Sequence, residues 1–221
     1  PETGEMIGEP LQGHPNSVND LAFTPDGKDL LSVGCSYATS SICETGLILR
    51  WSMDETPELS KQIEAHDRDI YDIEISPDGS QFATASTDEV VLLRDIKSGD
   101  EVGDPILGHE FGVVSLAFSR DGLLLASGGI DEKIMLRDLG TRQRVGPMLE
   151  AHQGPVSSLA FSPSGDSLLS GGQDGMVYLW PMEVEKWMDL ACERAGRNLT
   201  QEEWTTYFGV DTYRETCSEL K

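Results

Sequence analysis

The sequence predicts an all-β fold made of four copies of one supersecondary unit, followed by a short α-helical tail. Its four histidines, His14, His66, His109 and His152, stand 52, 43 and 43 residues apart. A four-residue turn motif begins ten residues after each histidine. The motif reads Ser-Pro-Asp-Gly after His66 and differs from this by one residue in each other copy. A period near forty residues indicates that one unit is repeated and packed side by side.

The last copy gives the elements of the unit in order. Its expected strands are Val156 with 158–161, then 167–171, then 176–180, separated by turns at 162–165 and 173–175. These segments are apolar or β-branched, and the turns contain Gly, Asp, Pro and Ser. The third copy adds a fourth expected strand over 144–149. Four short antiparallel strands per period indicate a β-propeller blade.

The repeated residues resemble the WD40 repeat. The pattern is Gly-His, then Phe-Ser-Pro-Asp-Gly, then Leu-x-Ser-Gly-Gly-x-Asp-Gly-x-x-x-Leu-Trp, and it covers about residues 13–181. The resemblance implies WD40 β-propeller blades in four repeats with about 16 strands, at about 13–64, 65–107, 108–150 and 151–181. Residues 1–12 are expected to be the fourth strand of a preceding or closing blade, because 3–11 match 98–106 in phase. Residues 182–221 are expected to form the helical tail.

In the WD40 family a His, a Ser or Thr, a turn Asp and a Trp form a buried hydrogen-bond chain in each blade. The resemblance assigns this structural role to His14, Ser32, Trp51, His66, Thr84, Asp88, His109, Ser127, Asp131, His152, Ser170, Asp174 and Trp180. Only the last repeat has all four members. Arg94 and Arg137 stand where two repeats would have Trp, and Thr45 stands where the first would have Asp. We expect the incomplete sets to be weaker, because a partly satisfied buried polar chain is costly.

A His-Ser-Asp set also resembles a hydrolase triad, but one enzyme does not need the same triad at every period. No histidine is left over for catalysis or for binding a metal. The chain also lacks a complete phosphate-binding loop and a Gly-x-Ser-x-Gly motif. We therefore predict no enzyme activity, no catalytic residue and no cofactor.

By the geometry of the WD40 family, one end of the blades carries the loops that usually bind a partner. The candidate partner-binding residues on this end are Ser17, Asn19, Tyr37, Glu44, Asp69, Tyr71, Thr87, Val114, Ile130, Ser157 and Gln173. Tyr71 is the strongest single anchor, since aromatic side chains supply a large contact area at a low entropic cost.

The first repeat carries an insertion. Nineteen residues separate Ser32 from Trp51, whereas ten separate Ser170 from Trp180, so the loop between the second and third strands is longer. It is either a tolerated insertion or a binding loop. Cys35 and Cys43 could close it as a disulfide or bind a soft metal. A metal site is disfavoured because no spare His or nearby third Cys completes a zinc ligand set.

The formal charge of −23 disfavours DNA, RNA and anionic membrane surfaces as partners. It favours either simple solubility or a basic protein or peptide ligand. No apolar run approaches the eighteen residues of a membrane span, and no secretory leader opens the chain. We expect a cytoplasmic protein.

The tail changes from strand to helical periodicity. Apolar residues over 184–195 predict one helix, and Thr200-x-x-Glu203 predicts a capping box for a second helix that ends at Gly209. Cys192 and Cys217 are expected to approach each other as reduced thiols. Residues 183–217 resemble the segment that ends many bacterial WD40 proteins whose N-terminal half is a signalling NTPase of the apoptotic-ATPase-like (STAND) class, or sometimes a protease-like, TIR or kinase domain.

WD40 propellers usually close with about seven blades. Three arrangements therefore stay open: the C-terminal piece of a longer propeller, two chains that share an eight-bladed ring, and a closed four-bladed ring. The function that the resemblance implies is a non-catalytic protein–protein interaction scaffold or sensor module of a bacterial signalling protein. The alternative is a structural oligomerising module that closes a ring across chains through self-association. A propeller enzyme is the weakest hypothesis.

Overall fold

The computed structural model describes residues 8–39, 42–182, 198 and 200–208. In this part of the chain, fourteen strands form four antiparallel sheets, which we name blades 1 to 4. The strands are β1 (Val18–Phe23), β2 (Asp29–Thr39), β3 (Ile42–Ser52) and β4 (Glu58–His66) in blade 1, β5 (Ile70–Ile75), β6 (Gln81–Ser86) and β7 (Val91–Asp95) in blade 2, β8 (Val113–Phe118), β9 (Leu124–Gly129), β10 (Lys133–Asp138) and β11 (Leu149–Glu150) in blade 3, and β12 (Val156–Phe161), β13 (Ser167–Gly172) and β14 (Val177–Pro181) in blade 4. The mostly antiparallel β architecture agrees with the fold class that the sequence predicts.

Each blade starts with a hairpin whose turn is formed by the repeated four-residue motif. In blade 2 the Ser76 hydroxyl donates to Asp78 at 2.6 Å, and the Ser80 amide donates to the same carboxylate oxygen at 3.0 Å. Gly79 follows with a φ of 69°, a left-handed conformation that glycine adopts without strain. The Thr24 hydroxyl donates to Asp26 and the Ser119 hydroxyl donates to Asp121 in the same way. The motif therefore fixes where the first strand of these blades ends.

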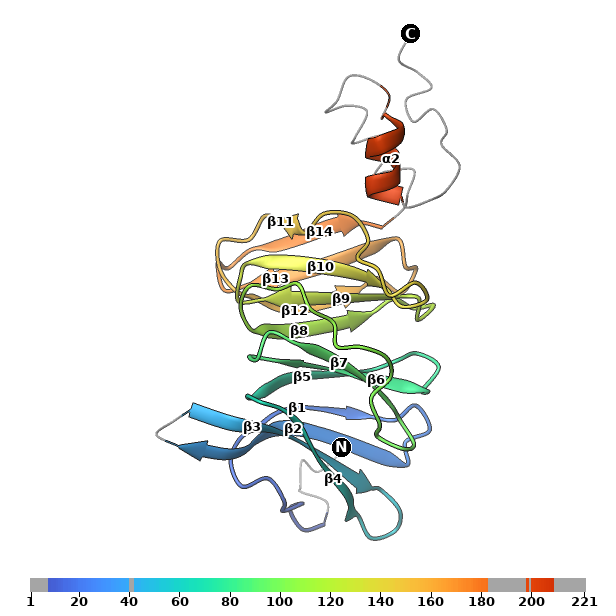
Figure 1. Cartoon of the computed structure of the whole chain (residues 1–221). Helices are drawn as coiled ribbons and strands as arrows, with labels where there is room; N and C mark the ends of the chain where they lie inside the picture. The colour runs from blue at the N-terminus through green and yellow to red at the C-terminus, as the bar shows by residue number, and fades with distance from the viewer. Residues whose placement is uncertain (1–7, 40–41, 183–197, 199, 209–221) are drawn as a thin grey trace.

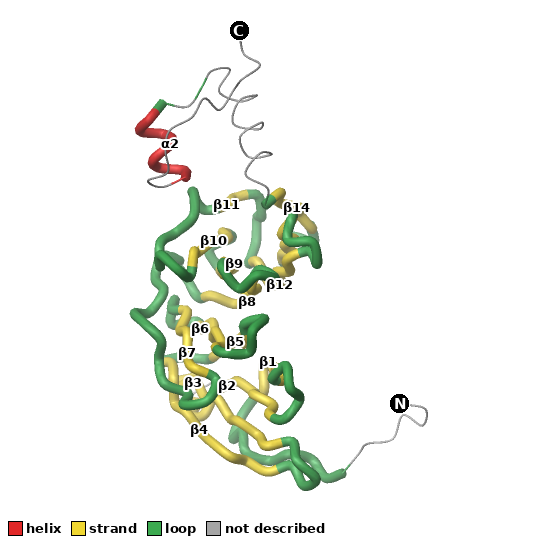
Figure 2. The backbone as a smooth tube through the Cα atoms, turned by 90° about the vertical axis from the view of Figure 1, so that its right-hand side faces the viewer, coloured by secondary structure: helices red, strands yellow, loops and turns green. Residues whose placement is uncertain are grey.

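The blades follow one another face to face in chain order. Figure 1 shows blade 1 at the bottom, blade 2 above it and blades 3 and 4 overlapping at the top, and the turned view in Figure 2 shows that the row is curved. The first strands β1, β5, β8 and β12 are neighbours along the inner side of the row. The described residues form an open arc, which differs from the closed four-bladed ring considered above.

Apolar clusters fill each junction between blades. Leu31, Val33 and Ile48 of blade 1 pack against Ile70, Ile73 and Phe82 of blade 2. Two further clusters join blade 2 to blade 3 and blade 3 to blade 4. A fourth cluster, of Leu47, Leu49 and Trp51, lies within blade 1. Because successive side chains point to opposite faces of a sheet, inner strands that are buried at almost every position, such as β6 and β9, supply a packing face on both sides of their blade.

The first strands also exchange hydrogen bonds between blades. The Asp20 carboxylate accepts from the Ile73 amide at 3.0 Å, and the Asp72 carboxylate accepts from the Leu116 amide at 2.6 Å. At the last junction the Ser115 hydroxyl donates to the Val156 carbonyl at 2.8 Å. Burial, together with the neighbouring Asp20, raises the pKa of Asp72 to about 8. Burial likewise raises the pKa of Glu74 to about 7, so the first two junctions contain carboxyl groups that resist ionisation.

The fourth strands are less regular than the sequence predicts. In blade 2 only isolated bridges, Val91 to Ile106 and Arg94 to Glu101, mark this strand. In blade 3 the predicted strand over 144–149 is reduced to β11 and a bridge from Arg137 to Arg144. Residues 8–11 form no strand, and 3–7 lie outside the described residues. The outer edge of β14 therefore has no partner strand among the described residues.

The insertion in blade 1 is not a loop, which corrects the expectation from the sequence. β2 and β3 are each 11 residues long, and their pairing continues to Thr39 and Ile42. The pairing shifts register between Cys35 and Tyr37 and again between Tyr37 and Ala38. The inserted residues extend a hairpin because each strand satisfies the backbone groups of the other.

In the tail, the structure describes α2 (Gln201–Phe208), which ends one residue before the predicted Gly209. Thr200 and Glu203 cap it reciprocally: the Thr200 amide donates to the Glu203 carboxylate at 2.8 Å, and the Glu203 amide donates to the Thr200 hydroxyl at 3.2 Å. Trp204 is buried. The first predicted tail helix, Cys192 and Cys217 lie outside the described residues. Among those that are described, no helix has the length and hydropathy needed to cross a bilayer.

Candidate functional site: the loop rim and its supporting networks

The last repeat joins all four of its predicted network residues. His152 Nε2 lies 2.8 Å from the Ser170 hydroxyl, and the Trp180 indole donates to the same hydroxyl at 2.9 Å. On the other side of the ring, Nδ1 lies 3.0 Å from the Asp174 carboxylate. That carboxylate also accepts from the amides of Gln153 and Met176, which hold the pKa of Asp174 below its usual value. The network thus ties the loop before β12 to the turn before β14.

Repeats two and three form the same chain without its Trp. His66 lies 2.9 Å from both Asp88 and Thr84, and His109 lies 3.0 Å from Asp131 and 2.9 Å from Ser127. Both histidine side chains are almost fully buried. Each ring nitrogen therefore has a partner even though Trp is missing.

The arginines in the Trp positions turn away from these networks. Arg94 donates to the Gly99 carbonyl at 2.9 Å and to Glu101 at 2.8 Å, and Arg137 donates to the carbonyls of Arg142 and Leu107 at 2.9 Å. Their guanidinium groups hold the turns that lead into the fourth strand, at Gly99 and Arg142, and Arg137 also holds Leu107 in the segment before His109.

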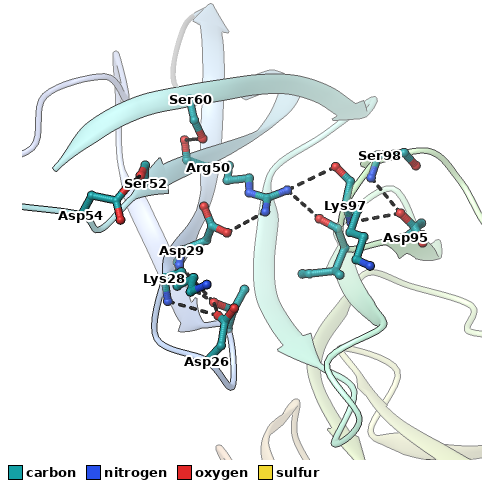
Figure 3. A network of polar contacts seen from close by, with 12 residues as sticks. Asp26, Lys28, Asp29, Arg50, Ser52, Asp54, Ser60, Asp95, Lys97 and Ser98 are labelled. Carbon is teal, nitrogen blue, oxygen red and sulfur yellow. Dashed lines mark hydrogen bonds and ion pairs between the residues drawn. The ribbon is translucent and has the colours of Figure 1, made fainter.

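A further arginine, Arg50, joins two blades. It donates to Asp29 at 2.6 Å within blade 1 and to the Ile96 carbonyl at 2.7 Å in blade 2. Figure 3 shows its guanidinium group between Asp29 and the turn of Asp95, Lys97 and Ser98.

The first repeat lacks the acidic member. His14 Nε2 lies 2.8 Å from the Ser32 hydroxyl, which also accepts from the Trp51 indole at 2.8 Å. The other ring nitrogen, Nδ1, is buried and has no partner among the described residues. Thr45 does not replace the Asp, because the longer hairpin places it inside β3, paired with Tyr37. Burial lowers the pKa of His14, which favours a neutral ring.

The candidate partner-binding residues gather at the end of the blades that these networks support; we call this end the rim. Ser17, Asn19, Glu44, Tyr71, Ile130, Ser157 and Gln173 are exposed, and Asp69, Thr87 and Val114 are half-buried. The side chain of Tyr37 lies outside the described residues. Tyr71 is 45% exposed, so its ring is available to a partner.

Neighbouring blades meet along the rim. The Asn19 amide of blade 1 donates to Asp69 at 2.9 Å and to the Ile70 carbonyl at 2.8 Å. Farther along, Thr87 of blade 2 lies so close to Gly112 of blade 3 that a side chain at Gly112 would collide with the Thr87 backbone, and Ile130 lies beside them. The rim is therefore continuous over blades 1 to 3.

Phe111 was not among the partner-binding residues predicted from the sequence, although its side chain is 57% exposed in the loop that follows His109. The signal was available: Asn16, Arg68 and Gly154 occupy the equivalent position, two residues after each histidine, and Phe is the apolar exception. Acidic side chains also surround the rim. The exposed ones include Asp67, Glu89, Glu110 and Glu132.

The inserted hairpin carries a disulfide. The Cys35 and Cys43 sulfurs are bonded, and the two Cα atoms are 5.8 Å apart. This is one of the two alternatives that the sequence left open. A carboxylate oxygen of Asp69 and the two sulfurs all lie within 4.8 Å of one another. Sequence reasoning could not find this third group, because it comes from the next repeat.

The comparisons with known proteins agree on one family. The family model "WD domain, G-beta repeat" matches residues 4–38, 57–95, 104–138 and 143–181. The chain is 27% identical over 112 residues to one of the subunits of chromatin assembly factor 1 of Gallus gallus, and the match covers 42% of this chain and 18% of that protein.

Solved structures show the same fold. The structure of U3-55K superposes with a TM-score of 0.67 at 24% identity, over 78% of this chain and 51% of that one. The RRP9 WD40 repeats superpose with a TM-score of 0.66 at 24% identity, over 77% of this chain and 49% of that one. The chain thus spans about half the length of these structures.

Proposed function

We propose that this chain, which belongs to the WD40-repeat family, is a non-catalytic scaffold that binds a protein or peptide on the rim. The observation that carries the proposal is the continuous rim with three exposed large apolar side chains, Tyr71, Phe111 and Ile130. Isolated exposed apolar residues are ordinary, but several on rigid loops are typical of a binding surface. All four histidines bond to Ser or Thr hydroxyls inside a blade, which supports a structural role for them.

A basic ligand fits this rim best. The charge of −23 and the exposed Asp67, Glu89, Glu110 and Glu132 attract Lys and Arg side chains. These acidic groups outnumber the two cations described in the same loops, Arg68 and Lys133. Complementary charge mainly raises the association rate, and the apolar anchors supply affinity. Phosphate backbones and anionic lipids are repelled by the same charge.

A display library of short peptides tests the rim. Selected binders should be rich in Lys and Arg, and Tyr71→Ala or Phe111→Ala should weaken them at least tenfold, or about 1.4 kcal/mol. Leu123→Ala is the matched control, because this exposed side chain lies after the turn at the opposite end of β8. Fluorescence anisotropy measures the affinities. Equal binding by all three variants would show that the rim is not the binding surface.

For the wider context, we propose the C-terminal interaction part of a bacterial cytoplasmic signalling protein. The support is the resemblance of residues 183–217 to the end of such proteins. The gene sequence upstream of the first codon tests it directly: an NTPase, protease-like, TIR or kinase domain in frame is expected.

A second candidate function is ring completion by self-association, and the end faces of the arc favour it. Leu21 on blade 1 is 56% exposed, although its equivalents Ile73 and Leu116 are each 2% exposed at internal junctions. Leu179 on blade 4 is 67% exposed, whereas its equivalent Leu136 is 1% exposed. Each end face of the arc therefore exposes an apolar position that is buried at the equivalent place in the internal junctions.

Light scattering on the purified chain tests this candidate. The wild type should be dimeric, and Leu21→Glu or Leu179→Glu alone should be largely monomeric. An equimolar mixture of the two variants should recover a dimer, because one junction between unlike chains then remains intact. A wild type that stays monomeric at high micromolar concentration would contradict ring completion and leave the rim proposal untouched.

A further inference from the structure

The pair Cys35 and Cys43 lies where two repeats meet on the rim. Cys35 belongs to β2, Cys43 to β3, and Asp69 to the segment between β4 and β5. The two sulfurs and one carboxylate oxygen lie within 4.8 Å of one another. Cys35 is 2% exposed, while Cys43 and Asp69 are half-buried, so the group is open on one side.

We propose that the reduced Cys35–Cys43 pair and Asp69 form a binding site for a thiophilic divalent cation of the zinc class. Thiolate and carboxylate are both zinc ligands, and three protein ligands leave a fourth, open position for water or for a group of the partner. The sequence near the two cysteines offers no third ligand. The fold supplies that ligand from a position 26 residues after Cys43.

The backbone geometry permits the change from disulfide to metal site. Two sulfurs bound tetrahedrally at about 2.3 Å from zinc lie about 3.8 Å apart. The Cα atoms of the two cysteines are 5.8 Å apart across the hairpin, which leaves room for both sulfurs on one cation. Rotation of the two side chains can therefore bring the sulfurs into place without breaking the strand pairing of β2 with β3.

Asp69 is positioned for this role. The Asn19 amide holds one carboxylate oxygen at 2.9 Å, and the Asp69 carbonyl accepts from the Thr87 amide at 3.1 Å. The bond from Asn19 orients this carboxylate, as second-shell hydrogen bonds commonly orient metal ligands.

The chemistry balances as two separate steps. A phosphine reductant transfers two electrons to the disulfide, and with one water molecule the products are two thiols and the phosphine oxide. Binding of the cation then displaces the two thiol protons to solvent, so affinity should rise with pH. In a reducing cytoplasm the first step is already complete.

The consequence would be a clamp between blades 1 and 2. The disulfide joins only β2 to β3, whereas the cation would also hold the loop that precedes Tyr71. Occupancy would therefore fix the rim beside its strongest apolar anchor. The site itself does not depend on the proposed partner, and its test requires none.

Cobalt(II) and zinc(II) alone are the probes. The full chain with Cys192→Ser and Cys217→Ser, reduced with a phosphine, should bind one Co²⁺ and show a near-ultraviolet sulfur-to-cobalt charge-transfer band. Zinc should displace the cobalt. Cys43→Ser should abolish the band, and Asp69→Asn should weaken zinc binding at least tenfold against a chromophoric chelator. Asp67→Asn, in the same loop, is the matched control and should bind normally.

Circular dichroism melting of each variant excludes unfolding as the cause of lost binding. Because Asp69→Asn keeps the oxygen that accepts from Asn19, it should melt close to the background protein. Absence of the cobalt band in the reduced background chain would overturn the proposal. Zinc affinity that is unchanged by Asp69→Asn would overturn it as well, because the cysteines would then act without the carboxylate.

Discussion

The first and last repeats place the same two groups, a histidine ring and a Trp indole, around a serine hydroxyl, but they differ on the far side of the histidine. In blade 4, Asp174 bonds to His152 and to the amides of Gln153 and Met176. In blade 1, His14 Nδ1 is buried without a partner among the described residues. The difference shows that the acidic residue is the link between the histidine loop and the turn after the second strand. Where a long hairpin replaces that turn, the link is lost.

The largest expected effect separates these two networks. His152→Ala leaves Asp174 and Ser170 short of a partner, and we expect a loss of about 2–4 kcal/mol in the free energy of unfolding. His14→Ala removes one good hydrogen bond and one unsatisfied nitrogen, so its loss should be about 1 kcal/mol. Urea denaturation of both variants measures the difference. Equal midpoint shifts would mean that Asp174 does not strengthen its network.

A second measurement extends the comparison to the junctions between blades. Because Asp72 has a pKa of about 8 in the fold against 3.8 ordinarily, the folded chain binds the extra proton in this range. The contribution of Asp72 to the free energy of unfolding is fully present below pH 3.8 and is lost as the pH rises towards 8. Asp72→Asn keeps an acceptor for the Leu116 amide and removes the charge.

The Asp72→Asn variant should therefore be more stable than wild type at pH 8, by on the order of 1–2 kcal/mol, and similar to it at pH 4. Thermal melts across this range give the result. Ser115→Ala, at the neutral junction between blades 3 and 4, is the control and should shift stability by a similar amount at both pH values. A pH profile for Asp72→Asn parallel to that of wild type would contradict the assignment.

The smallest effect concerns the Trp members. Trp180→Phe converts the last network to the three-membered type of repeats two and three, at an expected cost of about 1 kcal/mol. Trp51→Phe should cost more, because Trp51 is 4% exposed within an apolar cluster, whereas Trp180 is only half-buried. Denaturation midpoints compare the two. If Trp180→Phe cost more stability than Trp51→Phe, the hydrogen bond from the indole to the serine hydroxyl would contribute more than the packing of the ring.

The sequence predicted the all-β blades because the repeat period and the turn residues act locally. It also placed His, Ser or Thr and Asp at spacings that the structure brings within hydrogen-bond distance. It could not predict that the insertion extends a hairpin, since that depends on register. The bonds of Arg94 and Arg137 to distant carbonyls, and the approach of Asp69 to the cysteine pair, also depend on how neighbouring segments meet. Phe111 could have been found by aligning the loops after each histidine.

The open row of blades has a consequence for how the molecule unfolds. Blades 2 and 3 each share two apolar junctions, whereas blades 1 and 4 share one each. In such a linear array, stability is roughly the sum of each unit and its nearest-neighbour couplings. In a chain that remains monomeric, opening should therefore begin at blades 1 and 4 and move inwards. Amide exchange would then be slowest in β6 and β9, and the two terminal sheets would exchange independently of each other.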